Sequence, residues 1–213
     1  MLAKMISKNG LILAIFAAVC VGLIAITYYI TRDTIAGEME AALARTLNQL
    51  VAQNEYNNDV YHDCTLIEDA SKLGSNKPLK AYRMRQDGEP VAVVLESVAP
   101  NGYSGKITMV VGIYADGTVA GVRVTDHKET PGLGDKIDAK KSDWILSFSG
   151  KSLNNPKPAA WAVTKDGGQF DAFTGATITP RAVIQQVAKT LVFFENNKQQ
   201  LFEGPQNCGG SND

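Results

Sequence analysis

The chain has 213 residues, of which 45% are hydrophobic and 20% are charged, and its formal net charge is −1 at pH 7. This length is enough for one domain of ordinary size plus an appendage, and the composition is that of a folded protein rather than a disordered one. A net charge this close to zero gives no indication of a broad basic surface for nucleic acid.

The first strong feature is the stretch from Leu11 to Ile30, which contains no charged residue. At about 1.5 Å per helical residue, its length matches the roughly 30 Å hydrocarbon layer of a bilayer. A cleaved signal peptide is the competing interpretation, but its apolar core usually has only about 7–15 residues and is followed by a small-x-small cleavage site. Tyr28 and Tyr29 stand where interfacial aromatic rings are expected. We therefore predict an uncleaved, single-pass transmembrane helix.

The flanks of this span predict its orientation. Lys4 and Lys8 precede it, whereas Arg32 behind it is soon followed by acidic residues. The positive-inside rule then places residues 1–10 in the cytoplasm and the remainder of the chain outside it. In a bacterium the span would lie in the inner membrane and the C-terminal domain would be periplasmic.

Residues 31–75 are expected to form a connecting helical segment. Within it, a helix is predicted from Thr34 to Asn54, because apolar residues recur on one helical face: Leu43, Leu47, Leu50 and Val51. Such a stripe more often packs into a core than against a partner. The loop Gly74-Ser75-Asn76-Lys77-Pro78 then leads into the domain proper, residues 76–203.

Three Asp-Gly pairs punctuate sequence of β type in this domain. They are Asp87-Gly88, Asp116-Gly117 and Asp166-Gly167, with the flanking runs 81–85 and 90–98, 107–114 and 119–125, and 161–164 and 169–170. Each pattern predicts two strands joined by a tight turn that needs positive φ. Consecutive hairpins predict a mostly antiparallel sheet with helices packed against it, which is an α+β fold.

Two helices are predicted in the second half of the domain. A short one falls within 139–149 and buries Trp144, Ile145 and Phe148. A longer one runs from Pro180 to Phe202 and packs on the sheet through residues at near-helical spacing, namely Val183, Val187, Leu191 and Phe194. Residues 204–213 are expected to be an irregular tail.

The three cysteines divide according to the predicted topology. Cys20 lies in the span and behaves as a small apolar residue. Cys64 and Cys208 fall on the side expected to be oxidising, where they either form a disulfide or remain two free thiols. No Cys-x-x-Cys pair suggests an iron–sulfur cluster or a zinc site, and the two histidines, His62 and His127, suggest no nucleophile–base triad. We therefore predict neither a catalytic residue nor a metal site.

The run from Asp171 to Thr177 places a threonine hydroxyl in a turn of small residues ahead of a helix. Thr179 is the expected N-cap, with Pro180 at the first helical position. The helix start would favour an anion such as phosphate beside Thr177, because free N–H groups and the positive dipole end lie there. On local geometry alone, a polar loop ending in an ordinary helix cap is the simpler interpretation.

A second loop, Thr130-Pro131-Gly132-Leu133-Gly134, is tight and poor in side chains. Its spacing does not fit a phosphate-binding nucleotide loop. The backbone of such a loop can approach a flat ring, and Leu133 offers an apolar face, but a purely structural turn would use the same residues. Trp144 either buries one edge of such a ring or belongs to the core.

The pattern Asp-x-x-Thr-Gly-Ala-Thr at 171–177 resembles the signal for covalent flavinylation, in which FMN is joined through its phosphate to the last threonine. The resemblance covers nearly the whole chain, including the anchor and the segments 101–105, 127–136, 142–144, 161–163 and 165–168. It is a resemblance to the G subunit family of the Rnf/Rsx electron-transport complex. That family is related to the C subunit of the sodium-pumping NADH:quinone reductase.

By this resemblance, Thr177 carries FMN as a phosphoester, and Asp171, Thr174, Gly175 and Ala176 belong to the cofactor-binding site. A separate flavin transferase is implied to recognise Asp171 and the run from Thr174 to Thr177. Further flavin contacts are implied for Glu129, Thr130, Leu133 and Gly134. The chain would be an electron-relay subunit that works with other membrane and peripheral subunits, coupling electron flow between NADH and ferredoxin to ion movement. The alternative is a membrane-anchored periplasmic binding or assembly module without redox activity. A stand-alone flavin reductase is disfavoured, because no nicotinamide-binding fingerprint is present.

Overall fold

The structure is a computed structural model that describes residues 2–208, except for the side chains of residues 2–5, 33, 36, 39 and 40. The predicted tail therefore lies outside the described residues beyond Cys208. Of the charges that predict the orientation of the span, the side chain of Lys4 is also outside the description. The chain divides into two compact units, Met1–Leu43 and Ala44–Asp213.

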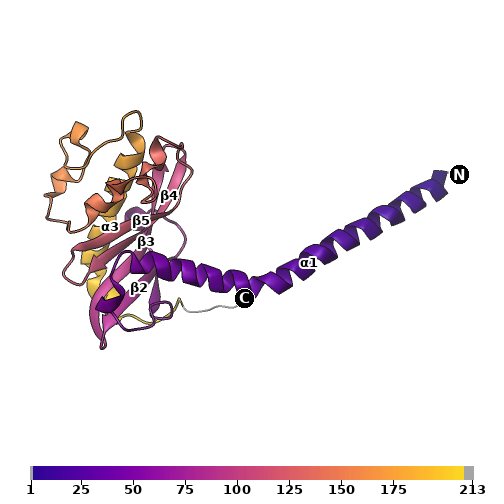
Figure 1. Cartoon of the computed structure of the whole chain (residues 1–213), viewed down its shortest axis with the longest axis horizontal. Helices are drawn as coiled ribbons and strands as arrows, with labels where there is room; N and C mark the ends of the chain where they lie inside the picture. The colour runs from indigo at the N-terminus through magenta and orange to yellow at the C-terminus, as the bar shows by residue number, and fades with distance from the viewer. Residues whose placement is uncertain (1, 209–213) are drawn as a thin grey trace. The chain divides into compact units, whose positions relative to one another are not determined.

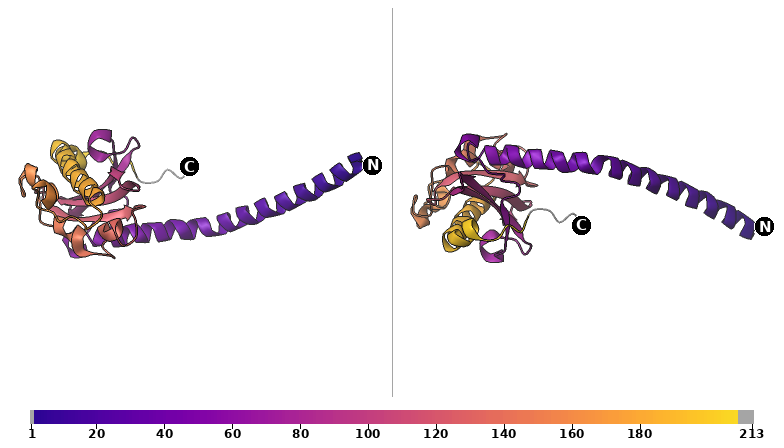
Figure 2. Two further views of the ribbon diagram at one scale, coloured as in Figure 1. Left: turned by 90° about the horizontal axis from the view of Figure 1, so that it is seen from above. Right: turned by 90° about the horizontal axis from the view of Figure 1, so that it is seen from below.

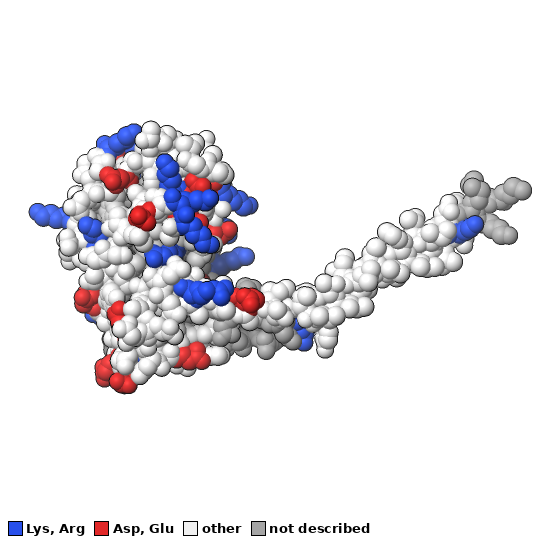
Figure 3. Space-filling model, viewed as in Figure 1, with Lys and Arg blue, Asp and Glu red and all other residues white. Residues whose placement is uncertain are grey.

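The first unit consists of most of α1 (Leu2–Asn48), the indigo-to-purple helix in Figure 1. Its stretch Ile6–Arg32 has a mean hydropathy of 2.7. Much of this surface is white in Figure 3, without Lys, Arg, Asp or Glu. The hydroxyls of Thr27 and Thr31 donate to carbonyls one turn back, each at 2.8 Å, so both are satisfied within the helix, as a lipid environment requires. The predicted N-terminal apolar helix is confirmed, and it fits a single-pass membrane protein.

The second unit is built on a five-stranded antiparallel sheet with strand order β1-β2-β3-β4-β5. The strands are β1 (Cys64–Ile67), β2 (Leu79–Gln86), β3 (Glu89–Gly102), β4 (Gly105–Tyr114) and β5 (Val119–Asp126). Asp87-Gly88 joins β2 to β3 with φ of 52° and 88°, and Gly117 turns β4 into β5 with φ of 90°. Two of the three predicted hairpins and the α+β fold are thus confirmed.

The third Asp-Gly pair does not form a hairpin. Residues Thr164–Asp166 form the 3-10 helix η5, and Val163 meets Phe170 in an isolated parallel bridge. The chain folds back so closely that a Cβ on Gly168 would lie 1.9 Å from the Ala162 carbonyl oxygen. The prediction of two strands here is wrong, because both side chains of the bridge are drawn into the core instead of pairing along a ladder.

α3 (Ile178–Glu203) crosses one face of the sheet and contacts β3 above all (Figure 2). Its apolar stripe is at most 1% exposed at Val183, Val187, Leu191 and Phe194, so the predicted long helix and its packing are confirmed. The short helix predicted within 139–149 is the 3-10 helix η3 (Asp143–Phe148), which buries Ile145 and Phe148 completely. The remaining helices are η1 (Gln53–Glu55), α2 (Ala70–Leu73), η2 (Gly134–Ile137) and η4 (Pro158–Ala160).

The other face of the sheet receives the chain that follows α1. Gly112 and Gly121 pair directly across β4 and β5, and together they leave a hollow. Leu50 fills it, because a Cβ on Gly112 would lie 3.2 Å from Leu50 Cβ, and one on Gly121 would lie 3.0 Å from Leu50 Cδ2. This docking turns the backbone, so the helix ends at Asn48 and not at Asn54 as predicted.

A disulfide and hydrogen bonds link the C-terminal part of the domain to the edge strand β1. Cys64 and Cys208 form a disulfide with a Cα–Cα distance of 5.5 Å, so the first of the two alternatives for these cysteines holds. Asn207 accepts a hydrogen bond from the Leu66 N–H at 2.7 Å, and the buried Arg83 donates to the carbonyl of Leu201 at 2.7 Å. The second unit therefore includes β1 and α2, which lie within the segment 31–75.

Candidate functional site

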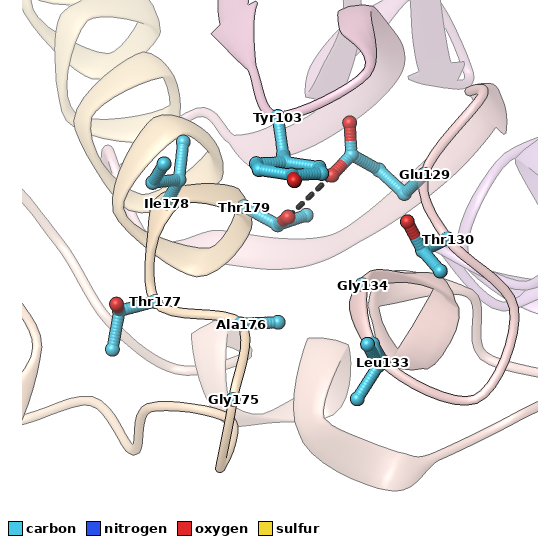
Figure 4. A pocket seen from close by; sticks show the side chains of 10 residues that line it. All are labelled: Tyr103, Glu129, Thr130, Leu133, Gly134, Gly175, Ala176, Thr177, Ile178 and Thr179. Carbon is cyan, nitrogen blue, oxygen red and sulfur yellow. Dashed lines mark hydrogen bonds between the residues drawn. The ribbon is translucent and has the colours of Figure 1, made fainter.

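A cavity of about 290 Å³ opens where three segments meet: the tip of the β3–β4 hairpin, the loop before η2, and the turn that enters α3 (Figure 4). These segments are far apart in the sequence, and the antiparallel sheet brings them to one end of the domain. The lining residues are Tyr103, Glu129, Thr130, Leu133, Gly134, Gly175, Ala176, Thr177, Ile178 and Thr179. Seven of the nine residues expected at the site from the sequence lie here, and Asp171 and Thr174 do not.

The loop from Thr130 to Gly134 is a tight turn around one carbonyl. The Thr130 carbonyl accepts hydrogen bonds from the N–H groups of Leu133 at 3.1 Å and Gly134 at 3.0 Å. Gly132 sits in the turn with φ of 77°, a conformation that favours glycine. The turn thus satisfies part of its own backbone hydrogen bonding, and the Leu133 side chain is 43% exposed at the cavity.

Aromatic packing in the core stabilises the turn before α3. Phe173 is buried, with its ring centroid 5.1 Å from that of Trp144. The Trp144 indole N–H donates to the Asp171 carbonyl at 2.9 Å, so the tryptophan supports the turn and does not line the cavity. Gly175 has φ of 82°, and the Ala176 N–H donates to the Phe173 carbonyl at 3.2 Å. The side chains of Asp171 and Thr174 are left exposed.

The start of α3 differs from the prediction. The helix begins at Ile178 and Thr177 occupies the N-cap position, although no side-chain capping bond is formed there among the described residues. Thr179 is inside the helix, 1% exposed, and its hydroxyl donates to Glu129. The prediction of Thr179 as N-cap is wrong, because a buried carboxylate 50 residues away takes its hydroxyl. Pro180 is tolerated at the third helical position, where an N–H would have no carbonyl four residues back within the helix.

Glu129 lies behind the cavity and is 4% exposed. One carboxylate oxygen accepts the Ser104 N–H at 2.9 Å and the other accepts the Thr179 hydroxyl, which the dashed line in Figure 4 marks. Its own N–H donates to His127 Nδ1 at 3.1 Å. Sequence reasoning placed Glu129 at the site but missed Tyr103, Ile178 and Thr179. Tyr103 stands in the segment 101–105 that carries the family resemblance, and this was the available signal for it.

The surface of the cavity suits a flat aromatic ring joined to a phosphate. Three apolar side chains remain exposed around it: Tyr103 at 68%, Ile178 at 47% and Leu133 at 43%. The N–H groups of Ile178 and Thr179 belong to the first turn of α3, where the helix offers them no carbonyl, and this end of a helix attracts anions. Among the side chains that the structure describes, no cluster of three or more His, Cys, Asp or Glu is placed to hold a metal ion. The residues present therefore fit FMN.

Comparison with known proteins assigns the two parts of the chain. A family model described as FMN-binding domain matches residues 102–192, and a second, described as RnfG N-terminal region, matches residues 1–50. The G subunit of the ion-translocating oxidoreductase complex of Pseudoalteromonas atlantica is 51% identical over 205 residues, covering 96% of this chain and 95% of that protein. The protein of the same name from Vibrio atlanticus is 48% identical, covering 96% and 98%.

Among solved structures, the crystal structure of NqrC from Shewanella oneidensis is similar with a TM-score of 0.48 and 24% identity, covering 70% of this chain and 72% of that one. The assignment rests on the sequence relatives, whose matches run along nearly the whole of both chains. Residues 102–192, which include the cavity, form an FMN-binding domain, and this supports a role in electron transfer. The chain belongs to the family of G subunits of ion-translocating oxidoreductase complexes, the RnfG family.

Proposed function

We propose that this chain relays electrons through an FMN that is joined by its phosphate to the hydroxyl of Thr177. The observation that carries the proposal is the contrast between two threonines at the cavity. The Thr179 hydroxyl is buried and engaged by Glu129, whereas Thr177 is only partly buried and, among the described residues, makes no capping hydrogen bond. Thr177 is therefore the threonine of this helix start whose oxygen is free to form an ester.

The surroundings of Thr177 support a phosphoester at this place. The hydroxyl stands beside the first turn of α3, where unpaired N–H groups and the helix dipole stabilise negative charge. In the proposed step the Thr177 oxygen loses its proton and forms an O–P bond, while the P–O bond between an activated flavin phosphate and its leaving group breaks and the leaving group takes the proton. The chain therefore gains the mass of FMN less one water. When bound, the flavin supplies the redox chemistry, and the protein holds and shields it. Tyr103, Leu133 and Ile178 offer apolar surface for that purpose.

A flavin transferase is the maturation partner that this arrangement requires. Asp171 and Thr174 are exposed on the turn, outside the cavity, where a second protein can reach them. Gly175 adds a left-handed turn, and a Cβ there would find its nearest atom, Leu133 Cδ2, at 3.7 Å. We propose that Asp171, Thr174, Gly175 and Ala176 form the recognition signal, while Glu129, Thr130, Leu133 and Gly134 frame the flavin.

The last part of the proposal concerns the membrane topology of the chain. We propose that α1 spans the bacterial inner membrane once, with residues 1–10 in the cytoplasm and the FMN-binding domain in the periplasm. A covalent tether keeps the flavin where no cytoplasmic nucleotide pool can replace it. The stretch Leu11–Ile30 contains no Asp, Glu, His, Lys or Arg side chain that could form an ion path. Coupling of NADH and ferredoxin oxidation–reduction to ion movement therefore depends on the other subunits of the complex.

Mass spectrometry of the intact full-length chain tests the proposal. Expression with a flavin transferase should add the mass of FMN less one water, and expression without it should not. Thr177→Ala should abolish the adduct, Thr177→Ser should retain part of it because the hydroxyl survives, and the exposed Thr125→Ala should label as the parent does. An unlabelled parent chain would leave a membrane-anchored binding or assembly module as the function.

A further inference from the structure

We propose that Glu129 is a positioning residue that holds the two walls of the cavity together and thereby sets the place of Thr177. Its consequences for the flavin rest on the proposed function, whereas the holding contacts belong to the chain itself. Glu129 comes from the loop before η2, and it reaches the hairpin tip on one side and α3 on the other (Figure 4).

The contacts of the Glu129 carboxylate use both of its oxygens. Oε1 accepts from the Ser104 backbone N–H at 2.9 Å, across 25 positions of sequence, and Oε2 accepts from the Thr179 hydroxyl, across 50 positions. Hydrogen bonds in a buried site, away from competing water, are stronger than the same bonds in water. At 4% exposure, this carboxylate has little access to water as a substitute partner.

The backbone on both sides is shaped around the same carboxylate. A Cβ on Gly102 would lie 2.9 Å from Glu129 Oε1, and a Cβ on Gly134 would lie 3.0 Å from Oε2. The Cβ on Gly134 would also lie 3.0 Å from Thr179 Oγ1. A Cβ at either glycine would therefore displace the carboxylate or its partners, so the two glycines let the hairpin tip and the loop approach Glu129 closely.

Glu129 affects Tyr103 and Thr177 through the two residues that it binds, Ser104 and Thr179. Ser104 is next to Tyr103, whose exposed ring lines the cavity, and only Ile178 separates Thr179 from Thr177. Thr177 directly precedes the first turn of α3, which contains Thr179, so a change in the position of this turn also changes the position of Thr177. A displacement of about 1 Å at a reacting group costs as much as a hundredfold in rate, so loss of this contact should slow attachment of the flavin.

Different substitutions remove the hydrogen bonds of Glu129 to Ser104 and Thr179 together or one at a time. Glu129→Ala removes both. Thr179→Val keeps the shape of the side chain and removes only the contact to α3, while the Ser104 N–H keeps its acceptor. Glu129→Gln retains an oxygen for Ser104 and an N–H₂ group for the Thr179 oxygen, so it preserves both contacts without the charge. Thr179→Ser preserves the hydroxyl, and Glu68→Ala, an exposed glutamate outside the cavity, is the matched control.

Hydrogen exchange of the full-length, flavin-free chain in detergent tests the contacts directly. In Glu129→Ala, the Ser104 amide and the Arg181 and Ala182 amides of the first helical turn should exchange about tenfold faster. In Thr179→Val only the helix amides should accelerate, and in Glu129→Gln, Thr179→Ser and Glu68→Ala none should. Unchanged exchange of Ser104 in Glu129→Ala, or equal acceleration in Glu129→Gln, would overturn the proposal.

Labelling by the transferase adds a readout at the flavin. Glu129→Ala and Thr179→Val should label about tenfold more slowly, and their attached flavin should show lower fluorescence anisotropy, with Glu129→Gln and Thr179→Ser close to the parent. Parent-like rates and anisotropy in Glu129→Ala and Thr179→Val would contradict the positioning role. An unlabelled parent would instead count against Thr177 as the attachment site, while the exchange pattern still decides whether Glu129 holds the walls.

Discussion

Thr177 and Thr179 stand two positions apart at the start of α3, and their side chains serve different ends. Thr179 is 1% exposed and donates its hydroxyl to Glu129, whereas Thr177 caps the helix by position only and lines the cavity. In Figure 4 the Thr179 side chain points toward Glu129, and that of Thr177 points away from it. Thr179 thus links α3 to Glu129, whereas the hydroxyl oxygen of Thr177 is free.

The left-handed turn at Gly175 should matter for labelling beyond its effect on stability. Gly175→Ala forces an alanine to φ of 82°, and Gly150→Ala does the same at 76° outside the motif, so each should lower the free energy of unfolding by about 1–2 kcal/mol. Only Gly175→Ala should also reduce flavin attachment, because it alone distorts the recognition signal. Urea unfolding and intact-mass labelling measure the two effects, and equal labelling of both variants would contradict this role.

The Cys64–Cys208 disulfide should stabilise the domain by closing a loop between residues 144 positions apart. Replacing both cysteines with alanine should lower the free energy of unfolding by about 2–5 kcal/mol. In unreduced, denatured protein the thiol of Cys20 should alkylate and the other two should not, so Cys20 serves as the internal control. Full alkylation of all three would show that the bond is absent.

Tyr82 should make the fold sensitive to alkali. Burial, and then the charge and hydrogen bond of Glu96, raise the pKa of the Tyr82 phenol well above its usual 10.0. The unfolded chain therefore ionises first, so the stability is complete below pH 10 and falls as the pH rises above it. Tyr82→Phe should cost about 1 kcal/mol at pH 7 through the lost hydrogen bond, yet show a shallower decline above pH 10.

Urea midpoints between pH 8 and pH 11.5 measure this difference, with Tyr103→Phe, which changes an exposed tyrosine, as the control. The parent and Tyr103→Phe should lose stability along parallel curves. If Tyr82→Phe followed the same slope as both, ionisation of Tyr82 would not be the cause of the alkaline loss.

The orientation of the anchor can be measured with reporters fused after Asp213. A reporter that works only in the periplasm should be active there, and one that works only in the cytoplasm should be silent, because Lys4 and Lys8 favour retention of the N-terminus inside. The opposite pattern, or release of the chain by a salt wash, would contradict the proposed topology.

Local sequence rules predicted those parts of the fold in which neighbours in sequence decide the structure. The turn at Asp87-Gly88 needs positive φ at both residues, and Asp87 and Gly88 adopt it. The stripe that begins at Val183 and ends at Phe194 repeats at helical spacing, and α3 buries it. The family resemblance, not a local rule, pointed to the loop at Thr130–Gly134 and the turn at Gly175–Thr177, and the fold brings both to one cavity.

The rest depended on contacts between distant residues. The partner that removes Thr179 from its expected capping role is Glu129, which no pattern near Thr179 reveals. The end of α1 at Asn48 follows from the hollow at Gly112 and Gly121, which exists only after β4 and β5 have paired. The Asp166-Gly167 pair resembles a hairpin turn, but Arg181 of α3 binds the Asp166 carboxylate at 2.6 Å and 2.7 Å.

A peptide mass map of the full-length chain after treatment with the flavin transferase tests directly whether Thr177 carries the flavin. We expect a single adduct of FMN less one water on Thr177, with Thr174 and Thr179 unmodified in the same peptide. Removal of one partly buried hydroxyl that caps nothing should leave Thr177→Ala within about 0.5 kcal/mol of the parent in stability, so loss of its adduct would not reflect unfolding. An adduct on Thr174, Thr179 or any other residue, or none at all, would contradict the assignment.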